Sequence, residues 1–225
     1  LRLVGSEMCI RDSYYIIRFE VNFMKTNEER LQDLMAYLDS VTRINPSDIP
    51  AIDLYMDQVT TFMDTHLSAS KRFGEDKILT KTMINNYAKN NLLPPPEKKK
   101  YSKNHILLLI FIYYFKNVLS FNDIEQLFSP ISENHFADGS NPELAELYTE
   151  IFSLEREQRK RLKDDVMAKF KAASGTFQDA EGDDQEYLRL FSFICELAFD
   201  VYLKKQMIEL LAEQLRQENP PKKKK

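Results

Sequence analysis

The stretch that most constrains the fold is a run of ten consecutive apolar residues near the middle of the chain, from Ile106 to Phe115. A membrane-spanning helix needs about 20 such residues, so this run is too short to cross a bilayer. Ser102 lies shortly before the run, and its hydroxyl can cap a helix by accepting a hydrogen bond from a free backbone amide. We therefore predict a helix that begins after Ser102, is buried on all sides and forms the core.

The composition of the whole chain favours an all-α fold. Five glycines among 225 residues leave little room for hairpin turns. Apolar residues recur at spacings of three and four, as they do on one face of a helix.

The first 23 residues read as a sequence of foreign origin. Leu3 to Ser13 correspond to a translation of a transposase adapter from sequencing libraries, and a ribosome-binding site can be back-translated from the codons just before Met24. We therefore expect residues 1–23 to be non-native. Cys9 lies in that segment, which leaves Cys195 as a single thiol, so a disulfide within the chain is excluded and a cytoplasmic location is expected.

A short amphipathic helix is expected at residues 80–91, with Thr80 as its N-cap. Met83, Ile84 and Tyr87 share one side. The other side is polar and has no carboxylate; it carries Lys81, Thr82, Asn85, Asn86 and Lys89. Asn can pair with adenine edges, and Lys and Thr can reach guanine or phosphate, so this side is typical of a helix that reads the major groove. The alternative is that these polar side chains only face water.

A lysine loop at residues 97–101 follows the short helix. Pro94 to Pro96 end the helix and stiffen the chain before Lys98, Lys99, Lys100 and Tyr101. Adjacent ammonium groups on a restrained loop suit contacts to phosphates, which give affinity without sequence information. A solvated charge run is the alternative interpretation.

Two further helices are expected around these segments. One covers residues 53–67 and is followed by a long loop, 68–78, whose basic residues can add phosphate contacts. The other is a short helix from Phe121 to Phe128, capped by Ser120 and packed through Ile124, Leu127 and Phe128.

The net charge of −4 conceals a polarity along the chain. Residues 71–116 contain ten Lys or Arg against three acids, a net charge of +7, so the remainder carries −11. An acidic protein with one concentrated basic segment is typical of a DNA-binding head on a body that does not bind DNA.

Three segments together resemble a known type of DNA-binding head: LTKTMINNYAKNNLLPPP, then KKKYS, then LSFNDIEQLF after the apolar run. They are similar to the winged helix-turn-helix of MerR-type regulators. They resemble more closely a bacterial family of unknown function, number eighteen thirty-six, which is itself similar to that head. The positions that match the MerR pattern are Tyr87, Leu92, Leu93, Pro95, Tyr101, Ser102, Phe121 and Ile124.

The chain departs from the MerR pattern in three places. The arginines usual in the reading helix are replaced by Lys81, Asn85 and Asn86, the usual glycine is Asn91, and the wing lacks a Gly-Tyr-Arg turn. The resemblance implies a winged helix-turn-helix at residues 51–132, in a homodimer that is joined by a C-terminal helix and binds a two-fold site on double-stranded DNA.

The remaining segments are expected to form helices around this head. We predict an N-terminal helix within residues 24–50, beginning at Thr26 or Asn27. A C-terminal helical region at 141–218, for dimerisation or for a small-molecule effector, is followed by a tail at 219–225. Its first helix is expected to begin at Asn141 and to run to about Ala173, and its charged second half fits either a projecting solvated helix or one side of a loose pair.

The last helix, expected at residues 185–217 after an acidic linker, carries an apolar stripe. The stripe fits either packing within the chain or pairing with a second copy, and packing within the chain is favoured. Its aromatic residues are also candidates for lining an effector pocket; these are Tyr187, Phe191, Phe193, Phe199 and Tyr202.

Residues for catalysis or metal binding are not expected. His66, His105 and His135 stand apart from cysteines and carboxylates at ligand spacing, and the chain has no Gly-rich phosphate loop or serine elbow. We therefore expect neither an enzyme, nor a cofactor, nor a membrane partner.

These observations together predict a sequence-specific DNA-binding transcriptional regulator. The alternative is a helical protein-interaction module that does not bind DNA. The residues expected to contact DNA are Lys81, Thr82, Asn85, Asn86, Lys89, Lys98, Lys99, Lys100 and Tyr101.

Overall fold

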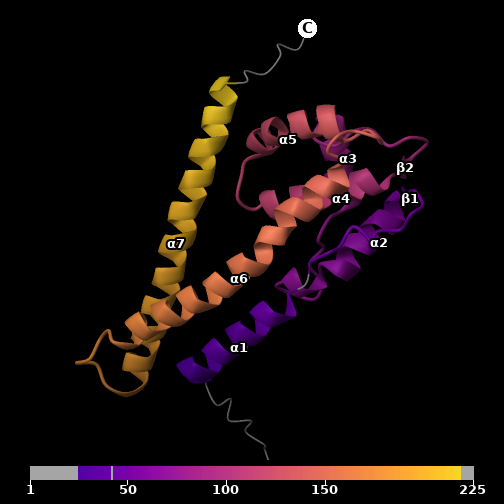
Figure 1. The fold of residues 1–225 in the computed structure, drawn as a ribbon. Coiled ribbons are helices and arrows are strands. Elements are labelled where there is room, and N and C mark those ends of the chain that lie inside the picture. The colour runs from indigo at the N-terminus through magenta and orange to yellow at the C-terminus, as the bar shows by residue number, and fades with distance from the viewer. Residues whose placement is uncertain (1–24, 42, 219–225) are drawn as a thin grey trace, which may run out of the picture.

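The structure, a computed structural model, describes residues 25–41 and 43–218. Its helices are α1 (Asn27–Ser40), α2 (Met56–His66), α3 (Lys81–Lys89), α4 (Lys103–Phe115), α5 (Phe121–His135), α6 (Leu144–Ser174) and α7 (Gly182–Glu218). β1 (Leu54–Tyr55) and β2 (Lys100–Tyr101) form one antiparallel two-stranded sheet. The described part of the chain is thus mostly helical, as predicted (Figure 1). The expected adapter segment and the tail at 219–225 lie outside the described residues.

Helix α4 forms the centre of the main core, which confirms the prediction from the apolar run. Every residue from His105 to Ile112 is buried. Residues from α2, α3, α5 and α6 surround it, including Met63, Ile84 and Phe128. Burial ends near the C-terminus of α4, where Tyr114 reaches the surface. We refer to this core and the elements from β1 to α5 as the head.

The segment before α2 differs from the prediction of a helix from residue 53. Leu54 and Tyr55 are extended and pair with Tyr101 and Lys100, so the helix begins only at Met56. The N–H of Tyr55 donates to Oε1 of Gln58 at 2.9 Å, which caps the start of the helix. The small sheet therefore joins the lysine loop to α2.

Helix α5 begins after Ser120, as predicted, with the N–H of Asp123 donating to Oγ of Ser120 at 3.3 Å. The predicted end at Phe128 is wrong, since the helix continues through Pro130 to His135. An internal proline removes one helical hydrogen bond. Packing of Ile131 against the main core offsets that loss.

Helix α6 leaves the head, and α7 turns back from the far end of α6 towards α5 (Figure 1). A second, smaller core joins α1, α6 and α7 through Leu31, Val166, Ala173 and Phe193. The charged half of α6 is therefore one side of a helix pair. The helix begins at Leu144 and not at Asn141, because the N–H of Glu143 is capped by Oε2 of Glu146 at 3.0 Å.

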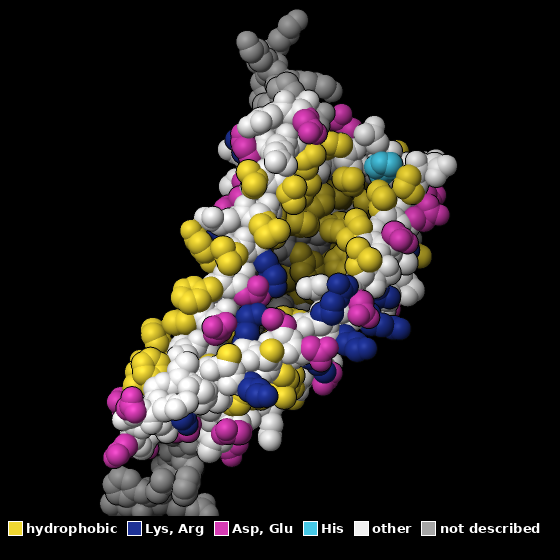
Figure 2. All heavy atoms as spheres, turned by 60° about the vertical axis from the view of Figure 1, so that its left-hand side comes forward, with side chains coloured by type: hydrophobic (Ala, Val, Ile, Leu, Met, Phe, Trp, Pro, Cys, Tyr) yellow, Lys and Arg dark blue, Asp and Glu magenta, His cyan; other side chains and the backbone are white. Residues whose placement is uncertain are grey.

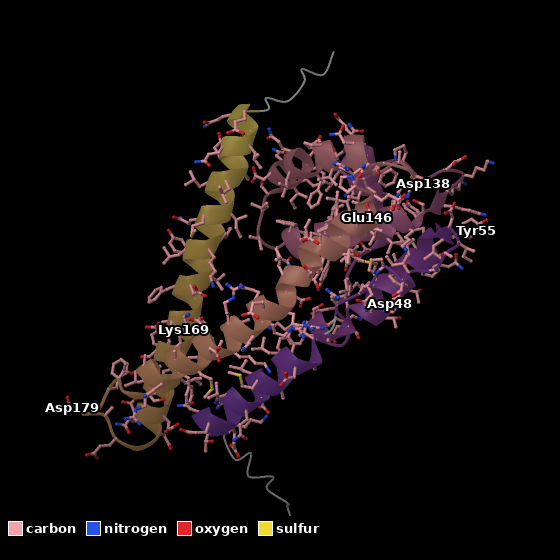
Figure 3. All side chains as sticks on the ribbon, in the orientation of Figure 1. Asp48, Tyr55, Asp138, Glu146, Lys169 and Asp179 are labelled. Carbon is pink, nitrogen blue, oxygen red and sulfur yellow. The ribbon has the colours of Figure 1, made fainter. Side chains whose placement is uncertain are left out.

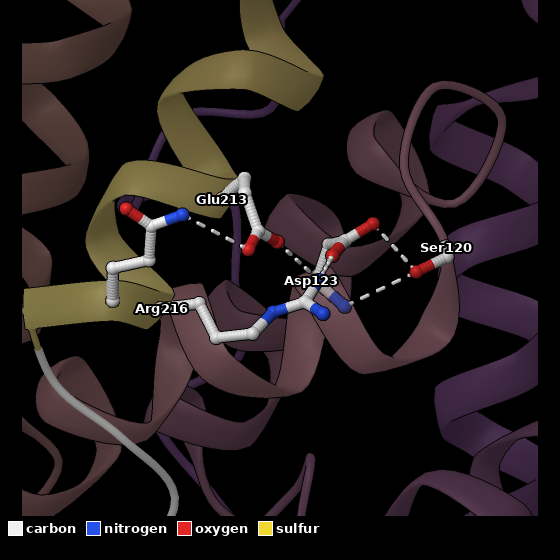
Figure 4. A network of polar contacts seen from close by, with 5 residues as sticks. Ser120, Asp123, Glu213 and Arg216 are labelled. Atoms are coloured by element: carbon white, nitrogen blue, oxygen red, sulfur yellow. Dashed lines mark hydrogen bonds and ion pairs between the residues drawn. The ribbon is translucent and has the colours of Figure 1, made fainter.

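The C-terminal end of α7 returns to the head. Ile208 packs against the main core, and Nη2 of Arg216 lies 2.6 Å from Oδ1 of Asp123 (Figure 4). Oγ of Ser120 donates to the other oxygen of Asp123 at 2.6 Å. The hydrogen bond from Ser120 has the larger effect, and with the contact from Arg216 it holds the pKa of the Asp123 carboxyl below its usual value.

The apolar stripe of α7 is largely exposed, so the favoured interpretation of packing within the chain is wrong for most of its residues, although Leu197 and Ile208 pack against the two cores. Within α7 only Phe193 and Ala212 are buried. The exposed residues include Tyr187, Phe191, Ile194, Val201 and Tyr202, each more than half accessible to solvent. Figure 2 shows hydrophobic side chains along this edge of the molecule and a hollow lined by hydrophobic side chains beside it.

The aromatic residues of α7 do not converge on one effector pocket. Phe193 packs edge-on against Phe170 of α6, with ring centroids 5.3 Å apart. Tyr187, Phe191 and Phe199 are exposed. They therefore do not enclose a shared cavity with Phe193.

Candidate nucleic-acid interface

The two faces of α3 lie as the sequence predicts. Ile84 and Tyr87 are buried in the main core, and Met83 is half-buried against it. The ring of Tyr87 stacks with that of Phe121, with centroids 6.3 Å apart. All of the predicted polar residues are exposed: Lys81, Thr82, Asn85, Asn86 and Lys89. The buried side of α3 thus packs against the main core, and its opposite side presents polar side chains to solvent.

The ends of α3 are both fixed by hydrogen bonds. At its start, Oγ1 of Thr80 accepts from the N–H of Met83 at 3.2 Å, which confirms the predicted cap. At its end, Asn91 takes a left-handed conformation with φ of 62° and donates to the carbonyl of Ala88. The N–H of Leu92 donates to the carbonyl of Tyr87 at 2.9 Å. This pair of bonds is a Schellman motif, in which asparagine replaces the more usual glycine.

The lysine loop is a tight hairpin, here called the lysine hairpin, from Glu97 to Tyr101. The N–H of Lys100 donates to the carbonyl of Glu97 at 2.9 Å, and the tip residues Lys98 and Lys99 have φ of 48° and 64°. Two successive positive φ angles are typical of type I′ turns, which favour Asn-Gly. For residues with a Cβ this conformation costs about 1–2 kcal/mol each. The expectation that so few glycines leave little room for hairpins is therefore wrong at this turn.

Tyr101 is the one predicted DNA contact that the structure places inside the protein. Its side chain is 3% exposed, and its ring lies edge-on to that of His105 with centroids 5.4 Å apart. Because Leu54 pairs with it across the sheet, Tyr101 anchors the hairpin. Its hydroxyl does not lie on the polar surface that the lysines form.

His105 is the residue that sequence reasoning missed. Its Nδ1 accepts the N–H of Ser102 at 3.0 Å, and its Nε2 lies 3.2 Å from the carbonyl oxygen of Pro94. The buried ring thereby connects α4 to the proline segment between α3 and the lysine hairpin. Burial lowers the pKa of the ring, and the hydrogen bond to Pro94 opposes this effect. The Ser-x-x-His spacing, which places a side-chain acceptor at the third helical position, is the signal that could have identified it.

Several of the predicted cations have partners within the protein. Lys81 forms an ion pair with Asp57 at the start of α2. Nζ of Lys100 lies 5.4 Å from the ring centre of Tyr55, in a cation–π contact. These contacts orient the two side chains while leaving their charges at the surface.

Other lysines of the basic segment are engaged in the structure of the head. Lys71 pairs with Asp64 at 2.7 Å, and Lys116 donates to the carbonyl of Ile78 at 2.9 Å. Burial lowers the pKa of Lys116. The charge count along the sequence therefore overstates the number of cations that are free to contact a partner.

Neither a metal cluster nor a membrane-spanning helix is present among the residues that the structure describes. Within residues 25–41 and 43–218, no group of three or more His, Cys, Asp or Glu side chains is arranged to hold a metal ion. No helix in these ranges has the length and apolar character needed to span a bilayer.

The basic segment, α3 and the lysine hairpin all lie inside a region that matches a known family model. That model, described as "Domain of unknown function (DUF1836)", matches residues 44–151, from just before β1 to the second turn of α6. No curated protein and no solved structure matches the chain. Residues 44–151 are therefore similar to the family described as DUF1836.

Proposed function

We propose that this protein is a sequence-specific, DNA-binding transcriptional regulator with a MerR-like winged helix-turn-helix head. The observation that carries the proposal is the exposed polar face of α3, together with the exposed lysines at the tip of the lysine hairpin that follows it in the chain. Figure 1 draws α3 and β2 at the same end of the molecule. A helix with this face suits the major groove, and a basic hairpin beside it suits the flanking phosphates.

The proposed roles divide between the two elements. Asn85 and Asn86 have amides that can pair with adenine edges, so they carry base preference. Lys98 and Lys99 project from the hairpin tip and contact phosphates. Lys81, Thr82, Lys89 and Lys100 add contacts at the edges of this surface, whereas Tyr101 acts from inside the head.

We propose further that two copies pair through α7. The exposed residues Tyr187, Phe191, Ile194, Ala198 and Val201 follow one another at spacings of four, three, four and three. This alternation of spacings is typical of the seam of a two-stranded coiled coil. A pair of this kind places two heads on a two-fold DNA site.

One experiment tests the regulator directly. Genomic DNA fragments are selected on the full chain, and the enriched sequence is then titrated at several salt concentrations. A regulator enriches one related set of sites, and the logarithm of its affinity falls steeply with the logarithm of salt concentration. The proposal is abandoned if no fragment is enriched at low salt.

The exposed stripe of α7 also favours a second candidate, a protein-interaction module without DNA binding. Large exposed apolar patches mark protein contacts. In that case the protein binds its partner without a DNA requirement, and substitution of Asn85 and Asn86 leaves the interaction unchanged.

A further inference from the structure

A pocket outside the head lies between the segment that follows α1 and the middle of α6. Its volume is about 580 Å³, within the size range of small-molecule sites. In Figure 3, Asp48 marks the loop that continues from one wall of this pocket. The residues that line it are Val41, Arg43, Asn45, Ser153, Glu155, Arg156 and Arg159.

The walls of the pocket are held together by hydrogen bonds. Nη1 of Arg43 donates to the carbonyl of Phe152 at 2.9 Å, and the hydroxyl of Tyr148 donates to the carbonyl of Ile44 at 2.7 Å. Nε of Arg43 donates to Oδ1 of Asn45 at 3.2 Å. Because both walls are fixed in this way, the pocket is largely preformed.

The lining carries an excess of positive charge. It contains three guanidinium groups against one carboxylate, that of Glu155, which is paired with Arg159. Arg43 donates to neutral oxygens only, among the described residues. Arg156 is exposed, and within the described ranges no hydrogen bond or ion pair links it to another side chain. Two positive charges therefore face the pocket without a compensating carboxylate.

The chemistry of this lining selects an anion. Guanidinium groups bind carboxylate and phosphate oxygens through paired, charge-assisted hydrogen bonds. The amide of Asn45 and the hydroxyl of Ser153 offer further polar contacts, while Val41 supplies an apolar wall. A simple inorganic ion would leave much of the volume unfilled.

We propose that this pocket binds a small organic anion that carries carboxylate or phosphate groups. Arg156 and Arg43 hold its charged group, and Arg159 stays with Glu155 at the rim. The ligand connects the segment after α1 to α6. The site is distinct from the proposed DNA surface, and its occupancy does not depend on DNA binding.

The test is calorimetric titration of the full chain with sodium citrate and with sodium phosphate, each against sodium chloride at the same ionic strength. We expect saturable binding of at least one of these probes at one site per chain, and the stronger of the two indicates whether carboxylate or phosphate chemistry is preferred. Arg156→Ala should weaken that binding about tenfold or more, because it removes a charge-assisted contact.

The matched control is Arg161→Ala. Arg161 lies on the same helix, is exposed and does not line the pocket. If the probe binds in the pocket, removal of the Arg161 side chain should change the affinity for that probe by less than about twofold. The proposal is overturned if neither probe binds saturably, if Arg156→Ala binds as the unaltered protein does, or if Arg161→Ala weakens binding equally. Circular dichroism of both variants verifies that they are folded.

Discussion

The ring of His105 is hydrogen-bonded to the carbonyl oxygen of Pro94, with 3.2 Å between Nε2 and that oxygen. Since Nδ1 accepts the N–H of Ser102, the proton resides on Nε2, which donates to Pro94. The buried helix α4 thereby fixes the segment from which the lysine hairpin projects. The position of the hairpin thus depends on a neutral histidine.

This dependence predicts a loss of stability in mild acid. Burial holds the pKa of His105 below its usual value of 6.5, so the unfolded chain takes up a proton there more readily than the folded chain. The stabilising contribution is therefore present above about pH 6.5 and is lost as the pH falls below it. Urea unfolding between about pH 7.5 and about pH 5.5 should show a decreasing free energy of unfolding.

His105→Gln should reduce this pH dependence. Glutamine at the third helical position can still accept the N–H of Ser102, but it does not titrate. Substitution of the exposed His66 by glutamine is the matched variant for comparison. An equal slope in the His105 variant and the unaltered protein would contradict the assignment.

The lysine hairpin predicts opposite effects on stability and on DNA affinity. Replacing Lys98 and Lys99 with Asn and Gly relieves two strained positive φ angles, so the protein should be stabilised by about 1–2 kcal/mol. The same change removes two cations and should reduce the slope of log affinity against log salt by up to about two units. Thermal unfolding and salt titrations of DNA binding measure the two effects. A variant that gains stability and keeps its salt slope would show that the hairpin does not contact phosphates.

The polar face of α3 predicts a change in base preference. Asn85→Ala or Asn86→Ala should lose about 1–3 kcal/mol of discrimination at one base pair for each lost bidentate contact. Binding to an unrelated sequence should change little, because phosphate contacts remain. The matched control is Asn117→Ala, at an exposed position outside α3. Equal losses on specific and unrelated DNA would instead indicate a general structural effect.

The ion pair between Lys81 and Asp57 predicts that one substitution tightens DNA binding. Asp57→Asn frees the ammonium group of Lys81 and removes a negative charge beside the proposed DNA surface. We expect about two- to fivefold tighter binding at low salt, and a smaller gain at high salt. Asp33→Asn on α1 removes a comparable exposed charge far along the sequence and serves as the control. Unchanged affinity in the Asp57 variant would place Lys81 outside the contact surface.

The stripe on α7 predicts that a single charge dissociates the proposed dimer. Phe191 is 51% exposed, so Phe191→Glu should leave the folded chain intact while placing a carboxylate in the proposed seam. Analytical ultracentrifugation should then show a monomer. Such a monomer should contact only one half of a two-fold DNA site. Leu154→Glu alters an exposed apolar residue of α6 as the control. Persistence of a dimer in the Phe191 variant would exclude α7 as the interface.

Local signals predicted most of the head correctly. The caps at Thr80 and Ser120, the burial of Ile84 and the buried run of α4 follow from hydrogen-bonding groups and apolar spacing within a few residues. Such features depend on neighbours along the chain, and the sequence displays those neighbours directly.

Features that depend on distant segments could not be predicted in this way. The extended conformation of Leu54 depends on its pairing with Tyr101, and the length of α5 depends on packing beyond Pro130. The burial of Tyr101 and the pairing of Lys81 with Asp57 likewise result from tertiary contacts. The exposure of most of the α7 stripe could not be predicted either, because helical spacing alone does not distinguish a core from an interface.

The exposed stripe of α7 has a consequence for gene dosage under the proposed function. A dimer of the proposed regulator, paired through Phe191 and its neighbours, forms in proportion to the square of the subunit concentration when subunits are scarce. On that proposal, occupancy of a DNA site rises more steeply than the amount of the protein itself.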